Sequence, residues 1–234
     1  KRNAQGEVII TAAGLPARPS EIEYVACALP DWEGAFNTSL RFKNLSFSMQ
    51  WDGKVGGKTY SQSHHKMCEQ GHLSETLNGR KPGTSLYLDI TDPDVLKLFE
   101  QQKITPVAGV YCIAPGVVDN GDGTYSPNRK LVTLESYYKE YYRIGNVETN
   151  TFSTTYLKLR EVRLDYQLPK KWLKNTFISN ASVGVYGRNL LCITSYPMFD
   201  PETTSLDGNT FVPGVEVGTL PTSRSWGVNL KVDF

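Results

Sequence analysis

The sequence contains no long apolar run, and its mean hydropathy is −0.36, so it holds no candidate transmembrane helix. This composition does not exclude a membrane β-barrel, because barrel strands alternate apolar and polar residues and average to a soluble-looking composition. An excess of charge of one sign is also lacking. The net charge is +1, whereas a nucleic-acid partner would need clustered basic residues.

Cysteines are few and widely spaced, with no CxxC pair, which argues against a zinc ribbon or a redox motif. They are Cys27, Cys68, Cys112 and Cys192. The first residues include no Met and no apolar signal region. We therefore expect that a signal was removed or that the chain is a piece of a longer protein.

Aromatic and turn-forming residues are abundant. The 234 residues include 13 Tyr, 20 Gly and 13 Pro, a profile that is typical of a β-rich chain with long loops. Strict alternation is clearest over residues 223–234. Every second residue from Trp226 to Val232 is apolar, and the residues between them are polar. This period of two predicts a strand with one apolar and one polar face.

The same pattern predicts two further pairs of strands. Residues 35–58 predict a hairpin with a tight turn at Lys43-Asn44. Residues 153–168 and 178–193 predict a second pair, and a change of phase in the first of these strands predicts a β-bulge near Arg160. Several runs reach about ten residues, the length that a tilted membrane strand needs.

Connection lengths favour a membrane barrel over a soluble sandwich. Short turns join the strands within each pair, but residues 60–152 and 194–223 form long links. Short turns that alternate with long loops are typical of outer-membrane barrels. The charged face of each strand would then line the lumen, whereas in a soluble sandwich it would be an ordinary solvent face.

Several segments jointly resemble the SusC/RagA family of TonB-dependent outer-membrane transporters, from about residue 12 onward. These segments are Ala28–Gly34, Phe42–Ser46, Trp51–Gly57, Thr155–Lys171, Val185–Leu191, Phe199–Glu202 and Pro221–Phe234. The resemblance implies an all-β fold. The chain would be an antiparallel transmembrane β-barrel segment, about five strands of a larger barrel, with long extracellular loops containing short helices.

The family resemblance implies the C-terminal barrel portion of a SusC-like importer in the outer membrane of a Gram-negative bacterium. A SusD-like surface lipoprotein would act as a lid over a glycan or peptide ligand. TonB would act through the plug, which, with the rest of the barrel, lies outside this chain. We expect no catalysed reaction, no cofactor and no nucleic acid. A soluble β-sandwich ligand-binding module and a passive porin remain alternatives.

The expected organisation alternates loops and strands. It comprises an extracellular loop region 1–34, a barrel hairpin 35–58, a long extracellular loop 59–152, a second hairpin 153–193, an extracellular loop 194–222 and a final strand 223–234.

Strand phase assigns side chains to two faces. The expected lumen-facing residues are Glu161, Arg163, Asp165, Asn229 and Lys231, and the expected lipid-facing residues are Val162, Leu164, Tyr166, Trp226, Val228, Leu230 and Val232. The family resemblance implies that the aromatic Phe234 is the signal read by the barrel-insertion machinery.

Four other features can be interpreted either as functional sites or as ordinary structural elements. The sequence His64-His65-x-x-Cys68-x-x-x-His72 could bind zinc or copper, but its spacing fits no standard zinc module, so a His-rich polar loop is favoured. Residues 119–123 could form a calcium turn but lack the bidentate Glu, so a β-turn is favoured.

The pair Glu161 and Asp165 could suggest glycosidase chemistry, but Arg160 and Arg163 beside them favour ion-paired wall residues. A cluster of tyrosines is a candidate contact for ligand or lid, with loop packing or an aromatic belt as the alternative. Its members are Tyr137, Tyr138, Tyr141 and Tyr142.

Overall fold

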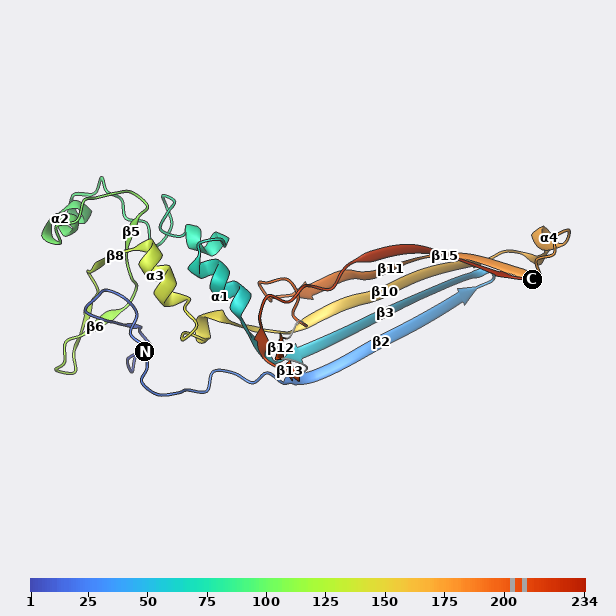
Figure 1. The fold of residues 1–234 in the computed structure, drawn as a ribbon, viewed down its shortest axis with the longest axis horizontal. Coiled ribbons are helices and arrows are strands. Elements are labelled where there is room, and N and C mark those ends of the chain that lie inside the picture. The colour runs from blue at the N-terminus through green and yellow to red at the C-terminus, as the bar shows by residue number, and fades with distance from the viewer. Residues whose placement is uncertain (203–204, 208–209) are drawn as a thin grey trace. The chain divides into compact units, whose positions relative to one another are not determined.

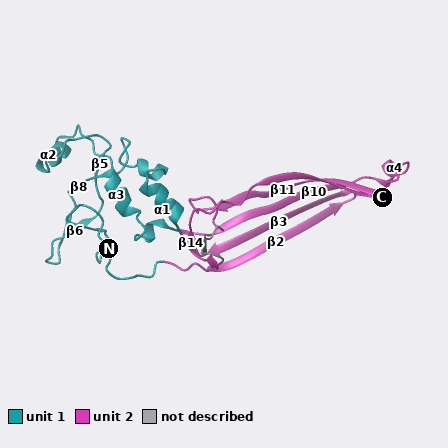
Figure 2. Ribbon diagram, in the orientation of Figure 1, with its two compact units in different colours: residues 1–25, 61–151 teal, residues 26–60, 152–234 magenta. Residues whose placement is uncertain are grey.

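The computed structural model describes residues 1–202, 205–207 and 210–234, and the chain divides into two compact units (Figure 2). Residues 1–25 and 61–151 form the first, which we call the loop unit. Residues 26–60 and 152–234 form the second, which we call the sheet unit. None of the helices in the described ranges is long and apolar enough to cross a membrane.

Five long strands build the sheet unit, all antiparallel to their neighbours, in the order β15-β11-β10-β3-β2 (Figure 1). They are β2 (Pro30–Phe42), β3 (Leu45–Gly56), β10 (Tyr156–Gln167), β11 (Asn180–Thr194) and β15 (Ser225–Asp233). Their alternating sequence explains their form, because a period of two separates apolar from polar side chains across a sheet. The predicted β-rich, antiparallel character of the chain is therefore confirmed.

Tight connections set the register of the strand pairs. Lys43 has a φ of 52°, the left-handed conformation that a two-residue hairpin turn uses. Asn44 stabilises the turn, because its side-chain Nδ2 donates to the backbone oxygen of Gln167 at 2.8 Å. Between β10 and β11, the short helix α4 (Lys170–Leu173) follows Pro169, which has no N–H to continue the sheet.

Two strand starts differ from the sequence prediction. β2 begins at Pro30 rather than at residue 35, because its regular pairing with β3 continues back to Trp32 and, beyond an irregularity, to Pro30. The predicted strand 153–168 is interrupted, and residues 151–153 form the separate strand β9 (Thr151–Ser153). β9 joins a small sheet of order β14-β4-β9 with β4 (Lys58–Ser61) and β14 (Val215–Glu216), and β12 (Ser205–Asp207) pairs with β13 (Thr210–Val212).

The loop unit has a core of its own. Its buried apolar cluster consists of Ile10, Leu86, Cys112, Ala114, Val132, Leu134, Tyr137 and Tyr138. Short strands surround it: β1 (Ile9–Ile10), β6 (Val117–Asp119) and β7 (Tyr125–Pro127) in one sheet, and β5 (Tyr111–Ile113) with β8 (Leu131–Thr133) in another. Because β1 pairs with β6, residues from the start of the chain fold with the predicted long loop.

Three α-helices of the loop unit start at side-chain caps. They are α1 (Gln62–Glu69), α2 (Pro93–Gln101) and α3 (Leu134–Tyr141), capped by Ser61, Asp92 and Thr133 respectively. α2 also has a proline in its first turn, where the missing N–H of proline costs no helical hydrogen bond. The unit also holds two 3-10 helices, η1 (Ser74–Leu77) and η2 (Glu148–Asn150).

Candidate functional site

The long sheet carries its apolar side chains in rows that cross all five strands. Leu164 of β10 lies opposite Phe47 on one side and Val185 on the other, and this row continues to the edge strands. The row is Leu40, Phe47, Leu164, Val185 and Val228, and the next is Phe42, Leu45, Tyr166, Val183 and Leu230. The sheet therefore has one continuous apolar face.

This apolar face is open to its surroundings. Val228 and Leu230 are 72% and 71% exposed, and Leu40 on the opposite edge strand is 63% exposed. Along β3 the face extends from Leu45 to Gly53, which is about 26 Å at about 3.3 Å per residue. This span covers nine residues, and a tilted membrane-spanning strand needs about 9–11 residues.

A β-bulge at Arg160 keeps the apolar face continuous. The register shifts between Leu159 and Glu161 against both neighbouring strands. Leu159 lies opposite Trp51, and Val162 lies opposite Met49, so both keep the same face although their spacing in sequence is odd. Without the extra residue, one half of β10 would turn its apolar side chains to the polar face. The predicted bulge is therefore confirmed.

The opposite face is polar, and its charged residues are ion-paired. Glu161 accepts a hydrogen bond from Arg188 on β11 at 2.8 Å, and Arg163 lies 2.5 Å from Asp165. Asp165 and Asn229 lie in one row on either side of Gly184, where any Cβ would collide with both side chains. The expected wall of ion pairs is thus present, with Arg188 as the partner of Glu161.

Register assigns each predicted set of side chains to one face. The apolar set, Val162, Leu164, Tyr166, Trp226, Val228, Leu230 and Val232, occupies the face described first, and the polar set, Glu161, Arg163, Asp165, Asn229 and Lys231, occupies the other. Phe234, just beyond β15, stacks on Phe177 with ring centroids 5.6 Å apart. Which face meets lipid stays a prediction.

A charged cluster on the polar face, buried at Lys158 and Asp200 and partly exposed elsewhere, anchors the segment that follows β11. We call it the anchor cluster; it consists of Asp52, Lys158, Arg160, Asp200 and Glu202. Lys158 Nζ lies 2.6 Å from Asp200 Oδ1 and also contacts Glu202. Arg160 binds Asp52 through two hydrogen bonds of 2.6 and 2.7 Å and also contacts Glu202. Tyr156 donates its hydroxyl to Glu202 at 2.7 Å.

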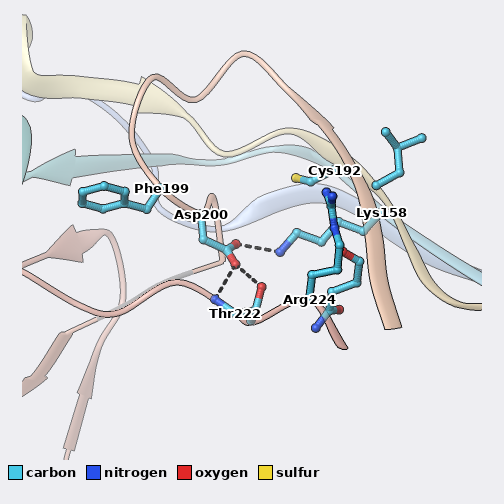
Figure 3. Close-up of a pocket in the computed structure, with 8 residues that line it drawn as sticks. Lys158, Cys192, Phe199, Asp200, Thr222 and Arg224 are labelled. Carbon is cyan, nitrogen blue, oxygen red and sulfur yellow. Dashed lines mark hydrogen bonds and ion pairs between the residues drawn. The ribbon is translucent and has the colours of Figure 1, made fainter. Parts of the chain in front are cut away.

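Asp200 connects both ends of this segment to β10 (Figure 3). Its second oxygen accepts from the backbone N–H and the hydroxyl of Thr222, while its first faces Lys158. Lys158 and Asp200 are 3% and 4% exposed, so the pair is shielded from water. A cavity of about 290 Å³ lies beside it, lined also by Cys192, Phe199 and Arg224.

Burial and hydrogen bonding act in opposite directions on the two loop carboxyls. Burial alone would raise the pKa of Asp200, but hydrogen bonds from Lys158 and Thr222 outweigh it, and the pKa lies below its usual range. The pKa of Glu202 is lowered in the same way, since donors on Arg160, Lys158 and Tyr156 outweigh its burial. Both groups are therefore held as carboxylates at neutral pH.

Sequence patterns did not single out the anchor cluster. Lys158 lies on the polar face because its neighbours Leu157 and Leu159 lie on the apolar face. A charged residue between two leucines is the sequence signal that could have identified it. Asp200 and Glu202 lie in a loop, where periodicity carries no information. Their contact with β10 depends on tertiary structure.

The tyrosine cluster contributes mainly to packing. Tyr137 and Tyr138 are buried in the core of the loop unit, where burial raises the pKa of the Tyr138 hydroxyl to about 12. Tyr141 and Tyr142 are partly buried against the same core. Packing is therefore favoured at the first two positions, and a contact with ligand or lid stays a prediction for Tyr141 and Tyr142.

Two motifs with metal-ligating residues have different outcomes. Residues 119–123 form the turn of the β6-β7 hairpin, where Asp119 and Asp122 accept hydrogen bonds from backbone N–H groups, as the favoured β-turn requires. In the described part of the chain, one group of three metal-ligating side chains comes together, namely His64, Cys68 and Glu75. The remaining histidines of the motif lie elsewhere: His65 faces Glu69, and His72 is exposed.

The chain is similar in sequence to two TonB-dependent receptors. No protein-family model matches the chain. It is 23% identical over 215 residues to TonB-dependent receptor P3 of Formosa agariphila, and 24% identical over 210 residues to TonB-dependent receptor P26 of the same organism. Both alignments cover 88% of this chain but only 16% and 17% of the relatives, so the chain spans about a sixth of the curated relatives it matches.

Solved structures show a similar fold. The RagAB peptide importer in the closed-closed state aligns with a TM-score of 0.54, 16% identity and coverage of 100% of this chain and 20% of that chain. A second structure of the RagAB peptide transporter aligns with a TM-score of 0.51, 18% identity and coverage of 98% and 20%. These findings support the resemblance to the SusC/RagA family that the sequence motifs carry.

Proposed function

We propose that the sheet unit is part of the wall of an outer-membrane β-barrel in a SusC-like TonB-dependent importer. The observation that carries the proposal is the pair of continuous faces, one apolar and exposed and the other charged, across five antiparallel strands. A soluble sandwich would cover its apolar face with a second sheet. In a barrel, lipid covers that face and water fills the other side.

The edges of the sheet support a place within a larger barrel. Among the described strands, β2 and β15 each pair with a long strand on one side only. Lipid offers no hydrogen bonds to backbone groups, so each edge needs a further strand in the membrane. Those strands would come from the rest of the transporter, which would also supply the plug and the contact with TonB.

A place in a barrel wall determines which face of the sheet would meet lipid and which would line the lumen. The apolar residues from Val162 to Tyr166 and from Trp226 to Val232 would meet lipid, and the charged residues between them would line the lumen. The ion pairs Glu161–Arg188 and Arg163–Asp165 suit the wall of a water-filled lumen. The anchor cluster would hold the segment after β11 against that wall.

The loop unit would lie outside the cell and contact a SusD-like lipoprotein lid over a glycan or peptide ligand. Its own buried core supports an ordered contact surface rather than a flexible tether. Peptide as one ligand class is supported by the fold similarity to a peptide importer. The lipoprotein follows from the family resemblance.

Replacing residues 60–152 by a short turn in the whole transporter tests this proposal. We expect the barrel to insert, as judged by its amount in the outer membrane, while lid association and nutrient uptake are lost. An epitope inserted between Gly121 and Gly123, at an exposed hairpin turn, serves as the matched control. It should leave uptake intact and bind antibody on unbroken cells. Wild-type co-purification of the lipoprotein with unchanged uptake in the shortened variant would contradict the role.

A further inference from the structure

We propose that His64, Cys68 and Glu75 of the loop unit form a binding site for a zinc ion. His64 and Cys68 lie one turn apart on the same face of α1, and Glu75 belongs to η1. His64 and Cys68 are 1% and 0% exposed, whereas the Glu75 side chain is 47% exposed. The site is thus closed on two sides and open to solvent along its carboxylate.

The distances between the three ligand atoms suit a four-coordinate zinc ion. Nε2 of His64 lies 3.2 Å from Oε2 of Glu75, Sγ of Cys68 lies 3.7 Å from the same nitrogen, and it lies 3.8 Å from the same oxygen. Zinc bonds of about 2.0–2.3 Å place neighbouring ligands of a tetrahedron about 3.3–3.8 Å apart. The centre of the triangle that the three atoms form lies about 2.1 Å from each, and an ion displaced about 0.7 Å from that plane, as a tetrahedral centre is, lies about 2.2 Å from each, which is a zinc–ligand bond length.

Outer hydrogen bonds hold the ligands in place, as is usual around protein metal sites. Nδ1 of His64 lies 3.0 Å from Oδ1 of the buried Asn150, and the Asn150 amide is itself oriented by donating to the backbone oxygen of Tyr142 at 3.0 Å. This arrangement leaves Nε2 as the nitrogen that faces Glu75, while Cys68 Sγ lies 3.7 Å from Nε2 and 3.9 Å from Nδ1. The Tyr142 hydroxyl donates to Glu75 at 3.2 Å.

The donor set and its charge favour zinc over other metal ions. One thiolate and one carboxylate neutralise a divalent cation, so the loaded site carries no net charge in its buried part. Nitrogen and sulfur ligands disfavour calcium and magnesium, and the carboxylate oxygen disfavours copper(I). Three protein ligands leave the fourth position to a water molecule at the exposed side.

Zinc binds cysteine as the thiolate, so binding should release the Cys68 proton and weaken as the pH falls. The loaded site would fasten α1 to η1.

Metal binding to the whole transporter that carries this chain tests the site, after chelator treatment, with zinc or cobalt(II) as the probe. We expect zinc binding by the wild type, and with cobalt(II) an absorption band from thiolate-to-cobalt charge transfer. Cys68→Ser should remove the band. Glu75→Gln, at a half-exposed side chain, keeps the shape of the residue and should weaken zinc binding at least about 10-fold.

Matched controls separate this site from other metal ligands in the protein. Cys112→Ser changes the other buried cysteine of the loop unit, and His72→Gln changes an exposed histidine of the same segment. Both should keep wild-type affinity and the cobalt band. Absence of the band in the wild type, its persistence in Cys68→Ser, or unchanged zinc affinity in Glu75→Gln would overturn the proposal.

Discussion

Removing the ammonium group of Lys158 should release the segment that follows β11. Lys158 is the cation that faces the buried Asp200, and it also contacts Glu202. In Lys158→Met the Asp200 carboxylate would keep its neutral donors, namely the Glu202 N–H and the N–H and hydroxyl of Thr222, but it would lose its cation while remaining shielded from water. Breaking a buried ion pair by removing one partner costs about 3–5 kcal/mol. The equilibrium between docked and released segment should therefore shift by about two to four orders of magnitude.

Limited proteolysis of the intact transporter by a broad-specificity protease measures this shift, because cleavage follows the population of the open form. Lys158→Met should be cleaved within residues 195–224 far faster than the wild type. Lys231→Met is the matched control. Lys231 is 71% exposed and forms a long ion pair of 3.7 Å with Asp233, and exposed pairs contribute about 0–1 kcal/mol. It should leave the cleavage rate nearly unchanged.

The double variant Lys158→Met/Asp200→Asn tests the electrostatic cause. Removing the stranded charge should restore much of the protection, because a buried pair replaced as a whole often costs little. Cleavage of Lys158→Met at the wild-type rate would refute the anchoring role. No recovery in the double variant would refute the ion pair as its cause.

Two further predictions follow from pKa and facing. The pKa values of Asp200 and Glu202 are lowered in the folded state. These carboxylates therefore stabilise the docked segment above about pH 4, where such groups ionise in the unfolded chain, and this stabilisation is lost as the pH falls through the lower folded pKa values. Protease protection of the segment should be constant from neutral pH to about 5 and fail below about 4. Leu230→Arg should destabilise the barrel by about 2–4 kcal/mol near the membrane midplane, and Asn229→Arg by much less. Urea unfolding of the protein in lipid vesicles measures both losses of stability. Equal losses at the two positions would contradict the assignment of Leu230 to lipid and Asn229 to the lumen.

Alternation in the sequence was sufficient to predict the long sheet. The period of two in β15 and the change of phase at Arg160 each correspond to a structural feature, namely the two faces and the bulge. The start of β2 escaped prediction, because residues 30–34 lack alternation and are strand only through pairing with β3. Local signals for a helix start are present at α2, which has an Asp cap, a proline and an acidic residue in its first turn, whereas α1 begins after Ser61 without an acidic first turn.

Contacts between distant residues account for the remaining differences. Glu75 was not associated with the His-rich motif, since only folding brings η1 against α1. The tyrosines of α3 are adjacent in sequence, and nothing in their spacing separates the two that enter the core from the two at its margin. Asp200 joins Lys158 across a loop, and no sequence period connects them.

The central claim is that the apolar face of the long sheet meets lipid and the polar face meets water. Nitroxide labels at single cysteines, introduced at residues 228, 229, 230 and 231 in the membrane-inserted transporter, test it most directly. The exposed Cys27 and Cys192 are first replaced by Ser, while Cys68 and Cys112 are buried. Collisions with oxygen, which concentrates in lipid, and with a water-soluble nickel chelate are then compared at each position.

We expect strict alternation of accessibility along β15. Labels at Val228 and Leu230 should collide mainly with oxygen, and labels at Asn229 and Lys231 mainly with the nickel chelate. Equal accessibility at all positions, or the opposite phase, would contradict the claim that this sheet is a membrane-spanning barrel wall.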